Sequence, residues 1–200
     1  LGLTIFAIIY GTRRYDPAGR NDAILFAVGF ESLFKLAALM AAGGLAIVLL
    51  TDIDQIARQS ALEQLADNFA PSHIDIDFFV ITLLSMTAIF CLPRQFYVTV
   101  IEARSGEDAI RARWPFIGYM LLTTLVVLPI SVAGLALLDA GTPPDTFVLQ
   151  LPLAAKLDSI AVLVFLGGFS AATAMVVVET IALATMVSND LVAPALLRNR

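Results

Sequence analysis

Long apolar segments separated by short polar ones dominate the hydrophobic and polar pattern of this chain. An α-helix needs about 20 consecutive apolar residues to cross the hydrocarbon core of a bilayer. The pattern predicts four such helices, preceded by the end of a fifth. The predicted spans are residues 1–10, 23–50, 78–99, 115–138 and 157–186.

The first of these segments, residues 1–10, is too short to cross a bilayer. We therefore expect the chain to be a fragment, with further parts of the protein before Leu1 and after Arg200. Residues 1–200 are predicted to form one partial, all-α integral membrane domain.

The basic residues between the apolar segments indicate the orientation, because cytoplasmic loops are enriched in Arg and Lys. Loops 51–77 and 139–156 are mainly acidic and contain only Arg58 and Lys156 as cations, so both are predicted to be external. The stretch from Ile56 to Phe69 is predicted to form a short interfacial helix. The remaining loops are arginine-rich and are expected to face the cytoplasm from the inner membrane: Arg13, Arg14, Arg20, Arg94, Arg104, Arg111, Arg113, Arg198 and Arg200.

Composition supports a membrane location and excludes several function classes. The chain is 59% hydrophobic and 14% charged, whereas soluble domains are about 45–50% apolar and about 25% charged. Its net charge of −5 argues against a nucleic-acid partner. The single cysteine, Cys91, can form no internal disulfide. The expected partners are the lipid bilayer and a small-molecule solute.

No catalytic motif is present in the sequence. It contains no phosphate-binding loop, no GxSxG or HExxH sequence, and no paired Cys/His spacing. His73 lies in a predicted external loop, where a solvated histidine is favoured over a metal ligand. We expect this fragment not to be an enzyme and to bind no cofactor.

Glu31 and Lys35 are ionisable residues within the predicted span 23–50. Ionisable groups inside a membrane are costly and are often functional. Their spacing of four residues places them on one helix face, where they can form an ion pair. The pair either fixes helix packing, which is the favoured interpretation, or contacts the substrate directly.

Pro93 and Arg94 interrupt the predicted span 78–99. Proline removes an intrahelical hydrogen bond, and the freed carbonyl is tolerated only inside protein or beside a water-filled cavity. Broken helices of this kind occur in secondary transporters. Ser85 and Thr87 of the same span are candidates for a substrate or ion path.

The predicted span 157–186 contains the small-residue stretch GGFSAATA, from Gly167 to Ala174. Small residues let helices approach closely, and a role in close packing competes here with a role in an ion or substrate site. Ser170 and Thr173 are three residues apart, so their hydroxyl groups point to similar sides of the helix. Glu179 is either protonated or paired with a group outside this chain, and it is a candidate for the ion path.

Three stretches resemble the sodium:solute symporter family, and most closely the symporter-like membrane domain of CbrA-type sensor histidine kinases. They read GTRRYDPAGRNDAILFAVGFESLFKLAA, FCLPRQFYVTVIEARSGEDAIRARW and MVSNDLVAPALLR. The resemblance implies a LeuT-type inverted-repeat transporter fold. This chain would hold the end of one span and four further transmembrane helices, with Pro93 in the broken helix of the second repeat.

One departure from the family bears on the coupling ion. Sodium-coupled members carry a Ser-Thr pair on the helix that corresponds to span 157–186. An ungapped comparison places Ala174 and Met175 at that pair, and neither residue is a hard oxygen ligand. We expect no metal site there and weak or absent sodium coupling. Protons are the expected substitute, with Glu179 as a candidate carrier.

The resemblance implies a domain that binds, and transports or senses, an amino acid such as histidine. It would act as the input module of a sensor histidine kinase whose kinase region lies in the cytoplasm. Two alternatives stay open: a stand-alone secondary cation:solute symporter, and a structural anchor with no transport path.

Overall fold

The computed structural model describes residues 22–70, 75–92 and 105–197, and all the regular elements in these ranges are helical. Segment 1–10, His73, Pro93, Arg94 and most of the arginines expected in the cytoplasm lie outside the described residues. The long helices are α2 (Asp22–Thr51), α6 (Gly106–Leu137) and α8 (Asp158–Val187). The shorter ones are α3 (Gln55–Asn68), α4 (Ile76–Cys91), η3 (Pro144–Thr146), α7 (Phe147–Ala154), the π-helical turn η4 (Ser188–Val192) and α9 (Ala193–Leu197).

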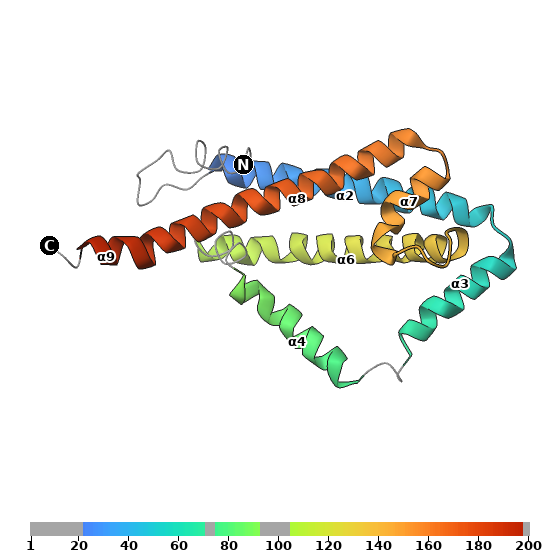
Figure 1. The fold of residues 1–200 in the computed structure, drawn as a ribbon, viewed down its shortest axis with the longest axis horizontal. Helices are drawn as coiled ribbons and strands as arrows, with labels where there is room; N and C mark the ends of the chain where they lie inside the picture. Colours follow the sequence, from blue (N-terminus) through green and yellow to red (C-terminus); the bar gives the residue numbers. More distant parts are fainter. Residues whose placement is uncertain (1–21, 71–74, 93–104, 198–200) are drawn as a thin grey trace.

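The three long helices are each long and apolar enough to cross a membrane. Helix α2 packs against both α6 and α8. Helices α2 and α6 run in the same direction, and α8 runs in the opposite direction (Figure 1). Most of their large apolar side chains face outward, among them Phe26, Leu125 and Phe165. A soluble protein rarely exposes so much contiguous apolar surface. The coarse prediction of an all-α chain with membrane-spanning helices agrees with this structure.

Helix α2 covers the predicted span 23–50, and α8 covers the predicted span 157–186. Helix α6 begins at Gly106, well before the expected start at residue 115. Its polar first turns are stabilised locally: the Asp108 carboxylate accepts a hydrogen bond from the Ser105 N–H at 3.2 Å. Arg111 also pairs with Glu107 at 3.3 Å, four residues before it. An apolar run marks the membrane segment, whereas capping and charge pairs decide where the helix begins.

The interface of α2, α6 and α7 forms the core of the bundle. Its buried residues are Ala42 and Ala46 of α2, Val126, Ile130 and Ala133 of α6, Phe147 and Leu151 of α7, and Val164 of α8. Alanines on α2 let the helices approach closely, and α7 places one aromatic ring against them. The short helix α7 therefore holds one end of the three long helices together.

Two glycines allow close contacts in this core. A Cβ atom at Gly134 would overlap the ring of Phe147, and one at Gly43 would overlap the side chain of Val126. Helix α2 continues through Gly43 and its neighbour Gly44. Close packing therefore requires glycine at position 43.

Helices α3 and α4 lie away from the core (Figure 1). Helix α3 matches the short helix predicted from Ile56 to Phe69, and it packs against α6 with Ala61 buried. Helix α4 begins with the Asp75 carboxylate accepting hydrogen bonds from the N–H groups of Asp77 and Phe78. It ends at Cys91, so it represents only the first part of the predicted span 78–99.

Candidate functional site

Glu31 and Lys35 form an ion pair on the face of α2 that meets α8. Nζ of Lys35 lies 2.6 Å from Oε1 of Glu31, and their side chains are 28% and 6% exposed, respectively. The predicted pairing of these residues is present in the structure. By these exposed fractions Lys35 is the more accessible partner, whereas the Glu31 carboxylate is almost fully enclosed.

The carboxylate of Glu31 is only partly satisfied. Lys35 is its partner among the described residues, and no hydrogen bond from another group there reaches either carboxylate oxygen. Buried polar groups in folded proteins are nearly always hydrogen-bonded, and an unpaired one costs stability. An ionisable group kept in this condition marks a candidate functional position.

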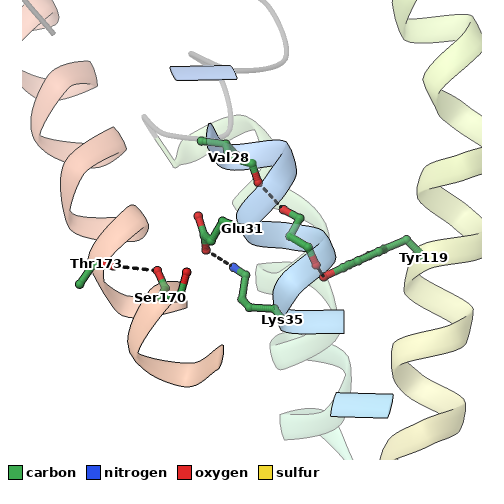
Figure 2. A network of polar contacts seen from close by, with 7 residues as sticks. Val28, Glu31, Lys35, Tyr119, Ser170 and Thr173 are labelled. Carbon is green, nitrogen blue, oxygen red and sulfur yellow. Dashed lines mark hydrogen bonds and ion pairs between the residues drawn. The ribbon is translucent and has the colours of Figure 1, made fainter. Parts of the chain in front are cut away.

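Helix α8 lies directly across from this pair. A Cβ atom at Gly167 would lie 2.6 Å from Cβ of Ala38 and 4.0 Å from Cα of Lys35, so the two helices are in close contact there. Helices α2 and α8 run in opposite directions (Figure 1), so Glu31, one turn before Lys35, lies opposite the turn that follows Gly167. Figure 2 shows Ser170 of that turn facing the ion pair.

A cavity of about 550 Å³ adjoins the pair. Lys35, Leu36 and Leu39 of α2 form one wall, and Gly167 and Phe165 of α8 form another. Volumes of about 300–1,000 Å³ are usual for small-molecule sites. The cavity is therefore large enough for a small solute, and Lys35 is one of the residues that line it.

Helix α6 adds hydroxyl groups to this cavity, and η3 adds a carboxylate. Tyr119 and Thr123 share one face of α6, and Asp145 belongs to η3. The Tyr119 hydroxyl donates to the carbonyl oxygen of Ser32 at 3.5 Å, close to the outer limit for a hydrogen bond. The Thr123 hydroxyl donates to the Met120 carbonyl at 2.9 Å. The long Tyr119 bond leaves its hydroxyl able to turn toward a ligand.

Of the predicted site residues on α8, the structure places Ser170 beside the ion pair, whereas Thr173 lies on the side of α8 that is turned away from it (Figure 2). Both are half-buried, and the Thr173 hydroxyl donates to the Ser170 carbonyl oxygen at 2.9 Å. Glu179 is also half-buried, but it lies about 13 Å farther along the helix and does not line the cavity. Ala174 is half-buried and Met175 is exposed.

Ser85 and Thr87 lie on α4, away from this site. Both side chains are exposed, and the Thr87 hydroxyl donates to the carbonyl oxygens of Leu83 and Leu84. Neither residue lines the cavity. The structure therefore does not bring these two candidates together with the ion pair.

Sequence reasoning missed Tyr119, Thr123 and Asp145 as cavity residues. The hydroxyl groups of the first two are four residues apart on an apolar helix, which is a usable signal for a shared polar face. Asp145 carried no such signal, because an acid in a predicted external loop is expected to be solvated. In the described ranges, no cluster of His, Cys, Asp and Glu could hold a metal ion.

Substituting Gly167 by alanine is expected to separate α2 from α8. The new methyl group would lie 2.6 Å from Cβ of Ala38, so one helix must shift, at a cost of about 1–3 kcal/mol. Gly168 is the matched control, because a Cβ atom there meets nothing within 4 Å. Thermal unfolding of the two variants in detergent micelles measures the difference. Equal melting temperatures for Gly167→Ala and Gly168→Ala would contradict this contact.

Comparisons of this chain with protein-family models, with curated proteins and with solved structures gave no match.

Proposed function

We propose that this chain is part of a membrane-embedded domain that binds a small-molecule solute, in the manner of a symporter. The domain would lie in the inner membrane, with its arginine-rich loops in the cytoplasm and with α3 and α7 on the outer side. An amino acid is the proposed solute, and the domain would serve as the input module of a sensor histidine kinase.

The observation that carries the proposal is an ion pair with a buried carboxylate beside a solute-sized cavity, which is lined by three helices that are apolar enough to span a membrane. A pair that only fixed helix packing would not need one of its two residues, Lys35, to line a cavity. Intramembrane charges that line a cavity are typical of substrate and ion paths. The purely structural anchor is therefore the least favoured alternative.

The link to a kinase rests on the sequence resemblance to CbrA-type proteins. The main alternative, a stand-alone symporter, shares the binding site and differs in the region that follows Arg200. Sodium coupling is proposed to be weak or absent, because Ala174 and Met175 replace the oxygen ligands that the resemblance predicts. Protons are the proposed coupling ion.

The test is solute uptake and phosphorylation by the full-length protein in proteoliposomes. We expect labelled histidine, or another amino acid, to bind and to enter with an imposed proton gradient. The same solute should alter autophosphorylation if a kinase region follows. Uptake that depends on a sodium gradient at fixed pH and voltage would contradict proton coupling. Failure of every amino acid to bind would overturn the proposed function.

A further inference from the structure

Lys35 has a place both in the ion pair and beside the cavity, and its ammonium group is the one cationic group among the described residues that line the cavity. The group pairs with the enclosed carboxylate of Glu31, whereas the residue that carries it lines the cavity and keeps 28% of its side chain exposed. A single ammonium group can neutralise only one carboxylate. A ligand carboxylate in the cavity would therefore compete with Glu31 for Lys35.

We propose that the cavity binds a small carboxylate with an apolar body through the ammonium group of Lys35, and that Glu31 takes up one proton as the ligand replaces it. This inference rests on the proposed solute-binding function and names the group that the site recognises. The proton comes from solvent, so the pair and its ligand carry the same net charge as the ion pair alone. A protonated Glu31 is a neutral acid, which a buried position accommodates without a cation.

The cavity walls favour this class of ligand. Apart from its few polar groups, the lining is apolar and includes Leu36, Val148, Val164 and Phe165. Such walls bury an apolar body and leave its carboxylate to the few polar groups of the lining. The Tyr119 hydroxyl can add a hydrogen bond to that carboxylate, since its present bond is long.

Other charged groups near the pair do not replace Glu31 in this role. Helices α6, α7 and α8 pack against α2. From α6, Tyr119 is the titratable residue that lines the cavity. Asp145 of η3, which precedes α7, also lines the cavity but is exposed to solvent. On α8, Glu179 lies about 13 Å beyond Ser170. Within the described residues, Glu31 is thus the carboxylate that competes for Lys35.

The test is calorimetric titration of the full-length protein in lipid nanodiscs with phenylacetate. Repeating the titration in buffers of different ionisation enthalpy measures the protons taken up. We expect one proton for each phenylacetate bound, and an affinity that falls with rising pH because binding takes up that proton. The neutral analogue 2-phenylethanol should bind about tenfold more weakly or worse, with no proton uptake. Phenylalanine and histidine, titrated in parallel, show whether a ligand ammonium group or a polar side chain is tolerated.

Two variants separate the roles of the pair. Glu31→Gln mimics the protonated acid, so it should bind phenylacetate with no proton uptake and with little dependence on pH. Glu31→Gln combined with Lys35→Gln removes both charges, so no unpaired buried charge remains that could unfold the protein. This double variant should bind phenylacetate about tenfold more weakly or worse. The exposed residues Glu63 and Lys156 provide matched controls, and Glu63→Gln and Lys156→Gln should behave as wild type.

Wild-type binding of phenylacetate without proton uptake would overturn the proposal, as would wild-type affinity in the double variant. If histidine binds wild type and both variants equally well, the carboxylate site fails while the proposed function stands. If the wild type binds none of these solutes, both fail.

Discussion

Replacing Lys35 by methionine is expected to destabilise the protein by about 3 kcal/mol, since removing one partner of a buried ion pair leaves an uncompensated charge. The Glu31 side chain is 6% exposed and has no other partner among the described residues. Methionine keeps the length of the lysine side chain and its contacts along α2, so the loss of the positive charge is the main change. The melting temperature in detergent micelles measures the effect.

A second substitution separates charge from packing at this site. Glu31→Leu combined with Lys35→Met removes both charges, and replacing a buried pair by apolar residues is often neutral or stabilising. We therefore expect the double variant to recover most of the lost stability while losing solute binding. Lys156→Met is the control, because Lys156 is exposed. A double variant as unstable as Lys35→Met alone would show that the destabilisation comes from packing.

Replacing Gly134 by alanine is expected to cost about 1–3 kcal/mol, which is the usual effect of overpacking a filled core. A Cβ atom at this position would overlap the ring of Phe147, with Cε2 of that ring at 2.6 Å. Phe147 is itself buried between α6 and the other long helices, so its ring has little room to move. We expect α7 to be displaced from the bundle. Thermal unfolding and proteolysis of the 139–156 segment measure this displacement.

Gly118 of the same helix is the control for Gly134. A Cβ atom there meets nothing within 4 Å, and alanine favours the helix by up to about 1 kcal/mol over glycine. The two substitutions should therefore have opposite signs. Replacing the Phe147 ring by a smaller side chain, in the double variant Gly134→Ala with Phe147→Leu, should restore part of the lost stability. Equal effects of alanine at positions 118 and 134 would exclude a specific contact with Phe147.

The positions of the helices were largely predictable from the apolar pattern. Helices α2 and α8 match their expected segments within a few residues, and α3 matches the predicted interfacial helix. Helix α6 differs at its start because the capping carboxylate of Asp108 and the pair of Arg111 with Glu107 extend it before the apolar run. These local polar contacts are readable in principle, but hydropathy alone does not detect them.

The site was predictable only in part. The spacing of Glu31 and Lys35 along one helix was enough to predict their pairing, since a helix repeats every 3.6 residues. Nothing in that spacing indicates which other helix faces the pair. Ser170 and Ser85 are both hydroxyl residues of apolar segments, yet only Ser170 lies beside the pair, because α8 packs on α2 and α4 does not join the core.

The sequence by itself determined the helical segments, their suitability for a bilayer and the ion pair within α2. These properties depend on neighbours a few residues apart, which periodicity and composition describe directly. Only the tertiary structure decided that Lys35 of α2, Tyr119 of α6 and Phe165 of α8 line one cavity. Which helix faces meet depends on close contacts between distant residues, such as Gly167 with Ala38 and Gly134 with Phe147, and each of these contacts requires both partners to be in place.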